Sequence, residues 1–145
     1  MKKPADPLLL ENQLCFALYS ASLQMTKLYK PLLAKIGLTY PQYLAMMALW
    51  EEDGVTVGAL GERLFLDSGT LTPLLKRLEA AGLIRRARNE ADERQVLIGL
   101  TPEGRALKRK AADIPGKAIC ATGLSLDELA DTKRKLEKLR AHLAA

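Results

Sequence analysis

The fold of this chain is decided by residues 66–101, LDSGTLTPLLKRLEAAGLIRRARNEADERQVLIGLT. In the first half of this stretch, apolar side chains recur at helical spacing while hydroxyl and basic side chains occupy the opposite face. The apolar positions are Leu71, Leu74, Leu75 and Leu78. Gly82 predicts the end of the helix, because glycine readily takes the left-handed conformation that follows many helices. One face of this helix can therefore pack on a core while the other faces a binding partner.

Two short β-prone runs follow the helix, Leu83-Ile84 and Val96-Leu97-Ile98. The polar segment from Asn89 to Glu93 predicts the turn that joins them into a hairpin. Four arginines gather on this hairpin, at Arg85, Arg86, Arg88 and Arg94. They could form a merely solvated basic face, but their place beside an amphipathic helix, in a chain of formal net charge +5, favours contact with phosphate groups.

The helix in this stretch could start at either of two places. Thr72-Pro73 would supply a cap and a first helical residue, whereas Asp67 or Ser68 would cap a longer helix that contains the proline. We favour the longer helix, because it places Ser68, Thr70 and Thr72 near the N-terminus. There, hydroxyl and N–H groups can meet phosphates or base edges.

The segments before this stretch are predicted to be helical. Helical periodicity extends from Glu11 to about Lys35, and Pro31 predicts a bend or an end late in this first helix. Two compact helices follow, at 41–50 and 57–64, and Thr56 is the expected cap of the second. Helix, tight turn, helix and hairpin are the order of a winged helix-turn-helix, which we place at residues 55–101.

Further helices are predicted after the hairpin. Thr101-Pro102-Glu103 combines a capping hydroxyl, a proline and an acid, and starts a helix that runs to about Asp113. Pro115-Gly116 predicts an interruption, with residues 117–122 as a separate or kinked turn. A capping box from Ser125 to Glu128 then starts the last helix.

The first and last helices carry apolar stripes outside the winged region. These are Leu14, Leu18, Ala21, Met25, Leu28 and Leu32 on the first helix, and Leu129, Leu136, Leu139 and Leu143 on the last. Such stripes favour a homodimer built from residues 11–35 and 102–145, and a monomer that packs the two helices on each other is the alternative. The expected fold is mainly α with a small β-hairpin wing: a winged helix-turn-helix with N- and C-terminal dimerisation helices, in one domain of 145 residues.

Composition limits the other classes of function. No apolar run is long enough to span a bilayer, and the N-terminus lacks the apolar region of a secretion signal, so we expect a cytoplasmic protein. In that compartment Cys15 and Cys120 are expected to be inert, metal-binding or redox-active rather than a permanent disulfide. A metal site is poorly supported, because the only histidine is His142 and no Cys-x-x-Cys motif occurs. We expect no cofactor.

Several segments together resemble a known family. LTPEG (100–104), following a basic hairpin that contains DER (92–94) and preceded by LEAAGLIRR (78–86), resembles the MarR family of dimeric repressors. Within that family, LCFALYSAS (14–22), Tyr29, LTYPQY (38–43) and LDSGTLTPLL (66–75) are similar to the organic hydroperoxide regulators, the OhrR type. The resemblance covers nearly the whole chain.

This resemblance implies a function and a set of site residues. It implies a homodimer that binds pseudo-palindromic operator DNA when reduced and releases it when an organic hydroperoxide oxidises Cys15. Tyr29 and Tyr40 would hydrogen-bond the sulfur of Cys15, and Cys120 would be the resolving cysteine of the two-cysteine subtype, which forms a disulfide between subunits. Arg94 would enter the minor groove, oriented by Asp92. The expected DNA-contacting residues are Ser68, Gly69, Thr70, Thr72, Lys76, Arg77, Arg86, Asp92 and Arg94.

The residues themselves constrain how such a thiol site is built. A thiol reacts with a peroxide as its thiolate, and Cys15 lies near the start of a long helix, where the helix dipole favours an anion. Tyr29 follows Cys15 by fourteen positions, which is about 21 Å along a straight helix. The sequence therefore predicts a pocket shared between two chains, unless the helix bends sharply.

Two other classes of function fit part of the pattern. A MarR-type regulator of a small anionic or phenolic ligand would keep the DNA contacts and have a silent Cys15. Independently of that class, Cys15 could be a small buried apolar residue beside the apolar stripe of its helix. A thiol peroxidase would use Cys15 catalytically with Cys120 resolving it. We expect no enzyme, because no recognisable active-site loop accompanies Cys15 and the basic hairpin would be left unexplained.

Overall fold

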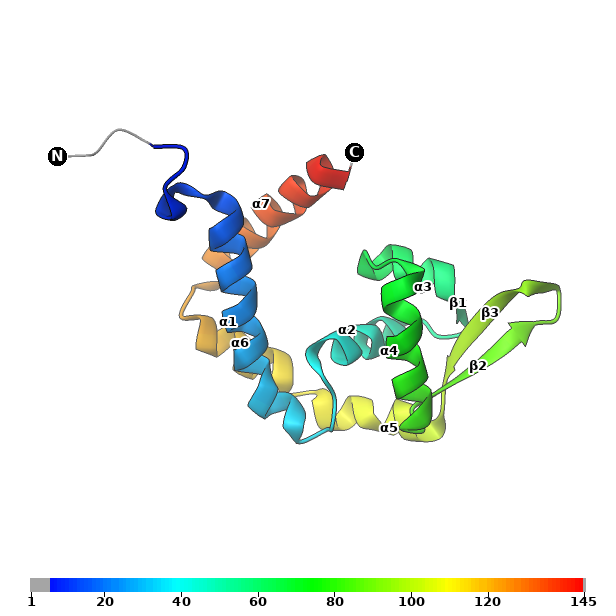
Figure 1. Ribbon diagram of the computed structural model, residues 1–145. Helices are drawn as coiled ribbons and strands as arrows, with labels where there is room; N and C mark the ends of the chain where they lie inside the picture. The colour runs from blue at the N-terminus through cyan, green and yellow to red at the C-terminus, as the bar shows by residue number, and fades with distance from the viewer. Residues whose placement is uncertain (1–5, 145) are drawn as a thin grey trace. The chain divides into compact units, whose positions relative to one another are not determined.

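Helices account for most of the chain in the computed structural model, which describes residues 6–144 (Figure 1). The chain divides after Ala112 into two compact units. The first contains η1 (Leu10–Asn12), α1 (Leu14–Ala34), α2 (Tyr40–Glu51), β1 (Val55–Thr56), α3 (Val57–Leu64), α4 (Ser68–Ala80), β2 (Ile84–Asn89), β3 (Asp92–Leu100) and α5 (Pro102–Ala111). The second contains α6 (Ile114–Thr122) and α7 (Leu126–Ala144). Among the described residues, no helix is both long enough and apolar enough to cross a membrane.

The first long helix starts later than predicted. A short 3-10 helix, η1, precedes it, and the Gln13 side chain donates back to the carbonyl oxygens of Pro7 and Leu9, just before η1. For this reason α1 begins at Leu14 instead of Glu11. Pro31 does not end the helix, because a proline this close to a C-terminus removes only one late backbone hydrogen bond.

The helix-turn-helix begins and ends where the sequence predicts. Thr56 caps α3 by accepting the N–H of Ala59 at 3.0 Å. The chain then turns through Phe65, whose φ of 58° is left-handed. Asp67 accepts the N–H of Thr70 at 3.2 Å, so α4 starts at Ser68 and the longer form of this helix is confirmed.

The predicted apolar face of α4 forms the centre of the core in the first unit. All four of its leucines are buried, Leu71, Leu74, Leu75 and Leu78. The other large side chains that are almost completely buried come from α1, α2, α3 and the sheet: Leu33, Met46, Leu49, Leu60, Ile84 and Ile98. Since these side chains come from five elements, α4 is held rigidly within its own unit.

The wing is longer than the predicted hairpin and has a third strand. The strand order is β1-β3-β2, antiparallel throughout. Pairing of β2 with β3 runs from Ile84 opposite Leu100 to Arg88 opposite Val96 and, after a register shift, ends with Asn89 opposite Asp92. The turn is therefore confined to residues 90–91, not 89–93 as predicted. The distal part of each strand is polar and exposed, and β1 has only two residues, so neither gave the apolar signal on which strand prediction depends.

Thr101 joins the base of the wing to the end of α4. It is buried, its hydroxyl donates to the Gly82 carbonyl at 2.7 Å, and its backbone N–H donates to the Leu83 carbonyl at 3.1 Å. The same hydroxyl accepts the N–H of Gly104 at 3.0 Å and caps α5, as predicted. One side chain thus fixes the end of α4 and the start of α5.

One prediction for the second unit, a separate or kinked turn at residues 117–122, is wrong. These residues belong to the helix α6. Pro115 lies in the first turn of that helix, where its missing N–H would have no intrahelical partner in any case. The capping box that starts α7 is confirmed, with the Glu128 N–H donating to Ser125 at 3.1 Å.

Candidate functional site

The outer face of α4 presents small polar and cationic side chains. Its exposed positions are Ser68, Gly69, Thr70, Lys76 and Arg77, and Thr72 is half-buried. Because the leucines of α4 face the core, these groups are left on the surface, the hydroxyls at the N-terminal end of the helix, where Asp67 accepts the N–H of Thr70. This face of α4 therefore carries donors of the kind that bind phosphates and base edges in protein–DNA complexes.

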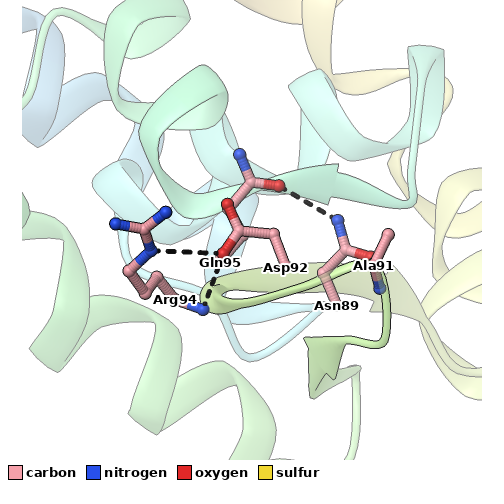
Figure 2. A network of polar contacts seen from close by, with 5 residues as sticks. All are labelled: Asn89, Ala91, Asp92, Arg94 and Gln95. Carbon is pink, nitrogen blue, oxygen red and sulfur yellow. Dashed lines mark hydrogen bonds and ion pairs between the residues drawn. The ribbon is translucent and has the colours of Figure 1, made fainter.

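Arg94 lies near the tip of the wing, with 93% of its side chain exposed. Asp92 Oδ1 accepts the backbone N–H of Arg94 at 3.1 Å and its Nε–H at 3.4 Å (Figure 2). Across the hairpin, the Asn89 side-chain amide donates to Gln95 Oε1 at 3.0 Å. In Figure 2 the terminal nitrogens of the Arg94 guanidinium point away from Asp92, so they are available to a partner.

Arg86, another predicted contact residue, is paired with Glu79 of α4. Its Nε–H and Nη2–H donate to Glu79 Oε1 at 3.1 and 2.9 Å, and its backbone N–H donates to Oε2 at 3.0 Å. These hydrogen bonds hold the pKa of Glu79 below its usual range. The pair joins the last turn of α4 to β2. Sequence reasoning missed Glu79, because it resembles any exposed helical carboxylate until the chain has reversed at Gly82.

A groove runs between α4 and the wing. It is lined by Thr56 and Gly58 at the start of α3, by Thr72 on α4, and by Arg94 and Gln95 on β3. The groove thus lies between Thr72 on the outer face of α4 and Arg94 near the wing tip. We give the name reading surface to the solvent-facing side chains of residues 68–77 and 86–95.

Cys15 lies in the first turn of α1, and its side chain is exposed. Among the described residues of the same chain, no other side chain buries Cys15. The N–H groups of a first helical turn have no intrahelical partner, and the helix dipole there favours a negative charge. Within the single chain, the thiol in this position is open to solvent.

Tyr29 and Tyr40 lie side by side in the first unit. Their ring centroids are 4.7 Å apart, and the ring of Tyr43 lies 5.8 Å from that of Tyr29. Helix α1 is unbroken between Cys15 and Tyr29, which puts them about 21 Å apart along the axis. The structure thus brings the two predicted tyrosines together, adds Tyr43 to them, and keeps Cys15 of the same chain at the far end of the helix.

The three tyrosines are expected to ionise at higher pH than free tyrosine. Burial raises the pKa of Tyr29, Tyr40 and Tyr43 above 10.0, so their phenols remain hydrogen-bond donors at neutral pH. A raised folded-state pKa contributes stability below pH 10.0 that is lost as the pH rises through the raised value. Ultraviolet titration of the phenolates should give a curve at higher pH for folded than for urea-unfolded protein. Coincident curves would contradict this packing.

Cys120 lies on α6 in the second unit, and it is also exposed. Both cysteines are free thiols. Among residues 6–144, no three His, Cys, Asp or Glu side chains are grouped closely enough to hold a metal ion.

Comparisons with known proteins place these features in a family. The family profile described as transcriptional regulator SarA/Rot matches residues 27–111. The chain is 55% identical to the organic hydroperoxide resistance transcriptional regulator of Bacillus subtilis, over 96% of this chain and 95% of that protein.

Solved structures agree with this assignment. Reduced AbfR bound to DNA has a TM-score of 0.78 and 39% identity, and the match covers 94% of this chain and 95% of that one. The disulfide form of AbfR, a protein of Staphylococcus epidermidis, has a TM-score of 0.62 and 38% identity, covering 93% and 90%. With its winged helix-turn-helix and a close relative matched along nearly its whole length, the chain belongs to the MarR family of DNA-binding transcription regulators, among the repressors of the OhrR type.

Proposed function

We propose that this protein is a homodimeric repressor that binds operator DNA when reduced and releases it when an organic hydroperoxide oxidises Cys15. The observation that carries the proposal is the exposed thiol in the first turn of α1, in a chain that also has a complete reading surface and a close tyrosine pair. The relatives support it: one is named for organic hydroperoxide resistance, and AbfR has been solved in reduced, overoxidised and disulfide forms.

The redox step follows from the chemistry of the thiol. The Cys15 thiolate attacks the terminal oxygen of the hydroperoxide, the O–O bond breaks, and after protonation the products are a sulfenic acid and an alcohol. The Cys120 thiol of the other subunit then attacks the sulfenic sulfur, forming a disulfide and releasing water. Two electrons pass from each thiol pair to the peroxide. A disulfide requires Cα atoms within roughly 7 Å, so in the oxidised dimer Cys15 of one subunit and Cys120 of the other must lie that close together.

Tyr29 and Tyr40 are proposed to act on Cys15 of the partner subunit. Within one chain the sulfur and Tyr29 are about 21 Å apart along an unbroken helix, whereas an antiparallel pair of α1 helices would bring one end to the other. The protonated phenols would donate to the thiolate and hold it in place.

A heterodimer tests this shared pocket. One subunit carries Cys15→Ser, and the other carries Tyr29→Phe. If the pocket is shared, this heterodimer has one intact pocket, and its single Cys15 should react with hydroperoxide at the wild-type rate. If each pocket belongs to one chain, both pockets are broken, and the heterodimer should react as slowly as the Tyr29→Phe homodimer.

The dimer itself is proposed from exposed apolar side chains. On α1 the described chain exposes Leu14, Tyr19, Leu23 and Met25, and on α7 it exposes Leu126, Leu136 and Leu143. Two reading surfaces related by a two-fold axis would enter half-sites about one helical turn of DNA apart, so the operator should be pseudo-palindromic.

Removal of Arg94 should weaken operator binding strongly. An exposed guanidinium oriented by Asp92 fits a narrow minor groove, and each such contact contributes about 1–3 kcal/mol. Arg94→Ala should therefore bind operator DNA roughly ten- to hundredfold more weakly per site in fluorescence anisotropy. Arg109→Ala on α5 removes the same charge outside the reading surface and is the control. Equal losses in both variants would mean that Arg94 contributes only net charge.

The function as a whole is tested by operator gel shift on the wild-type protein. We expect a stable complex that an organic hydroperoxide dissociates and that a small phenolic acid leaves intact. Dissociation by the phenolic acid alone would identify a ligand-responsive regulator. Sustained hydroperoxide consumption with a thiol reductant, without operator binding, would identify a peroxidase.

A further inference from the structure

An aromatic column runs along α2 from the tyrosine pair toward the wing. We use this name for Tyr29, Tyr40, Tyr43 and Trp50. Beyond the pair, Tyr43 is 2% exposed, and its ring centroid lies 6.4 Å from that of Trp50, in an edge-to-face arrangement. Aromatic pairs in this geometry attract one another, so the rings are coupled by contact from one end of α2 to the other.

The far end of the column is hydrogen-bonded to α5. Trp50 Nε1–H donates to the Gly104 carbonyl at 2.9 Å. Gly104 in turn lies directly against the backbone of Leu83, since a Cβ added at Gly104 would lie only 2.1 Å from the Leu83 oxygen. A displacement of Trp50 would therefore shift Gly104 and, through it, the backbone of Leu83 in the segment that joins α4 to β2.

A second contact holds the same end of α2 to the wing. Asp53 Oδ2 accepts the backbone N–H of Leu100 at 3.0 Å and a guanidinium N–H of Arg105 at 3.3 Å. These bonds lower the pKa of Asp53 and keep it ionised at neutral pH. The C-terminal end of α2 is thus hydrogen-bonded to residues on both sides of Thr101, to Leu100 of the wing and to Gly104 and Arg105 of α5.

We propose that Trp50 is a positioning residue that couples the state of the tyrosine pair to the reading surface. The inference rests on the proposed function, in which Tyr29 and Tyr40 donate hydrogen bonds to the Cys15 sulfur of the other subunit. Oxidation replaces that thiolate with a group of different size and charge, so the phenols must rearrange. The column transmits their rearrangement along α2, and the Trp50–Gly104 hydrogen bond passes it to the α4–β2 segment.

Trp50→Phe tests the coupling, because it keeps an aromatic ring and removes the N–H donor. We expect operator affinity of the reduced variant within about threefold of wild type, and oxidation of Cys15 at the wild-type rate by thiol assay. The ratio of operator Kd after oxidation to Kd before it should fall by about tenfold relative to wild type. Ile98→Val, which removes a buried methyl group from the same unit but leaves the column intact, should keep the wild-type ratio.

Trp50 fluorescence provides a second measurement on unmodified protein, because this is the only tryptophan of the chain. Its emission should change when the free dimer is oxidised, and the change should be smaller in Tyr40→Phe. A wild-type ratio in Trp50→Phe, or emission unaffected by oxidation, would overturn the coupling while leaving the proposed function standing. Failure of wild-type Cys15 to react with hydroperoxide would instead overturn the proposed function.

Discussion

Cys15→Ser protein is expected to bind operator DNA as tightly as the wild type and to stay bound when organic hydroperoxide is added. Serine differs from cysteine by one atom, and the reading surface lies on α4 and the wing, so reduced-state affinity should not change. A hydroxyl cannot form a sulfenic acid or a disulfide. Wild-type affinity should fall by roughly ten- to hundredfold under the same treatment, measured by gel shift.

Cys120→Ser separates the first oxidation from the second. We expect Cys15 to react with hydroperoxide as in the wild type, but non-reducing gels should show no bridged dimer. Without a resolving thiol the sulfenic acid is exposed to further, irreversible oxidation. Adding a reductant after the peroxide should therefore restore operator binding in the wild type and not in this variant. A bridged dimer in Cys120→Ser would exclude Cys120 as the resolving cysteine.

Gly104→Ala should destabilise the protein strongly. The new Cβ would lie 2.1 Å from the Leu83 oxygen and 3.3 Å from a Leu100 side-chain atom. The closest atom belongs to the backbone, so the wing base or α5 must shift. We expect a loss of about 3 kcal/mol or more in the free energy of unfolding, measured by urea denaturation.

Gly58→Ala is the matched control for this substitution. Gly58 also lies in a helix of the first unit, and its Cβ would meet no atom closer than 3.9 Å. Alanine should stabilise α3 slightly, by about 0.5–1 kcal/mol, because it restricts the unfolded chain and favours helix. Equal stability of Gly104→Ala and Gly58→Ala would mean that the close contact at Leu83 relaxes without cost.

Local sequence signals were sufficient for most of the fold. Thr56, Asp67, Thr101 and Ser125 start helices because each places an oxygen where a first-turn N–H needs an acceptor, and such caps are readable over four residues. The buried leucines of α4 followed from periodicity alone. Pro115 was misread because proline both ends and begins helices, and only the surrounding chain decides which.

The residues proposed for the site could be named from the sequence, but the contacts between distant segments that position them could not. The resemblance to a family proposes Cys15, Tyr29, Tyr40 and Arg94 as site residues, and their roles remain predictions. The contacts that join distant segments, such as Glu79 with Arg86, were not predicted, because no local pattern marks two residues that meet only after the chain folds back. Sheet strand β1 was missed for the same reason, since its two residues become a strand only by pairing with β3.

Whether oxidation of Cys15 releases the operator is tested most directly by measuring DNA release and the oxidation state of Cys15 on the same sample. Operator-bound protein is titrated with an organic hydroperoxide, the bound fraction is read by anisotropy, and the oxidation state of Cys15 is read by mass spectrometry of quenched aliquots. The fraction of DNA released should rise in proportion to the fraction of Cys15 converted to a disulfide. Release while Cys15 remains a thiol, or full conversion with the operator still bound, would contradict this mechanism.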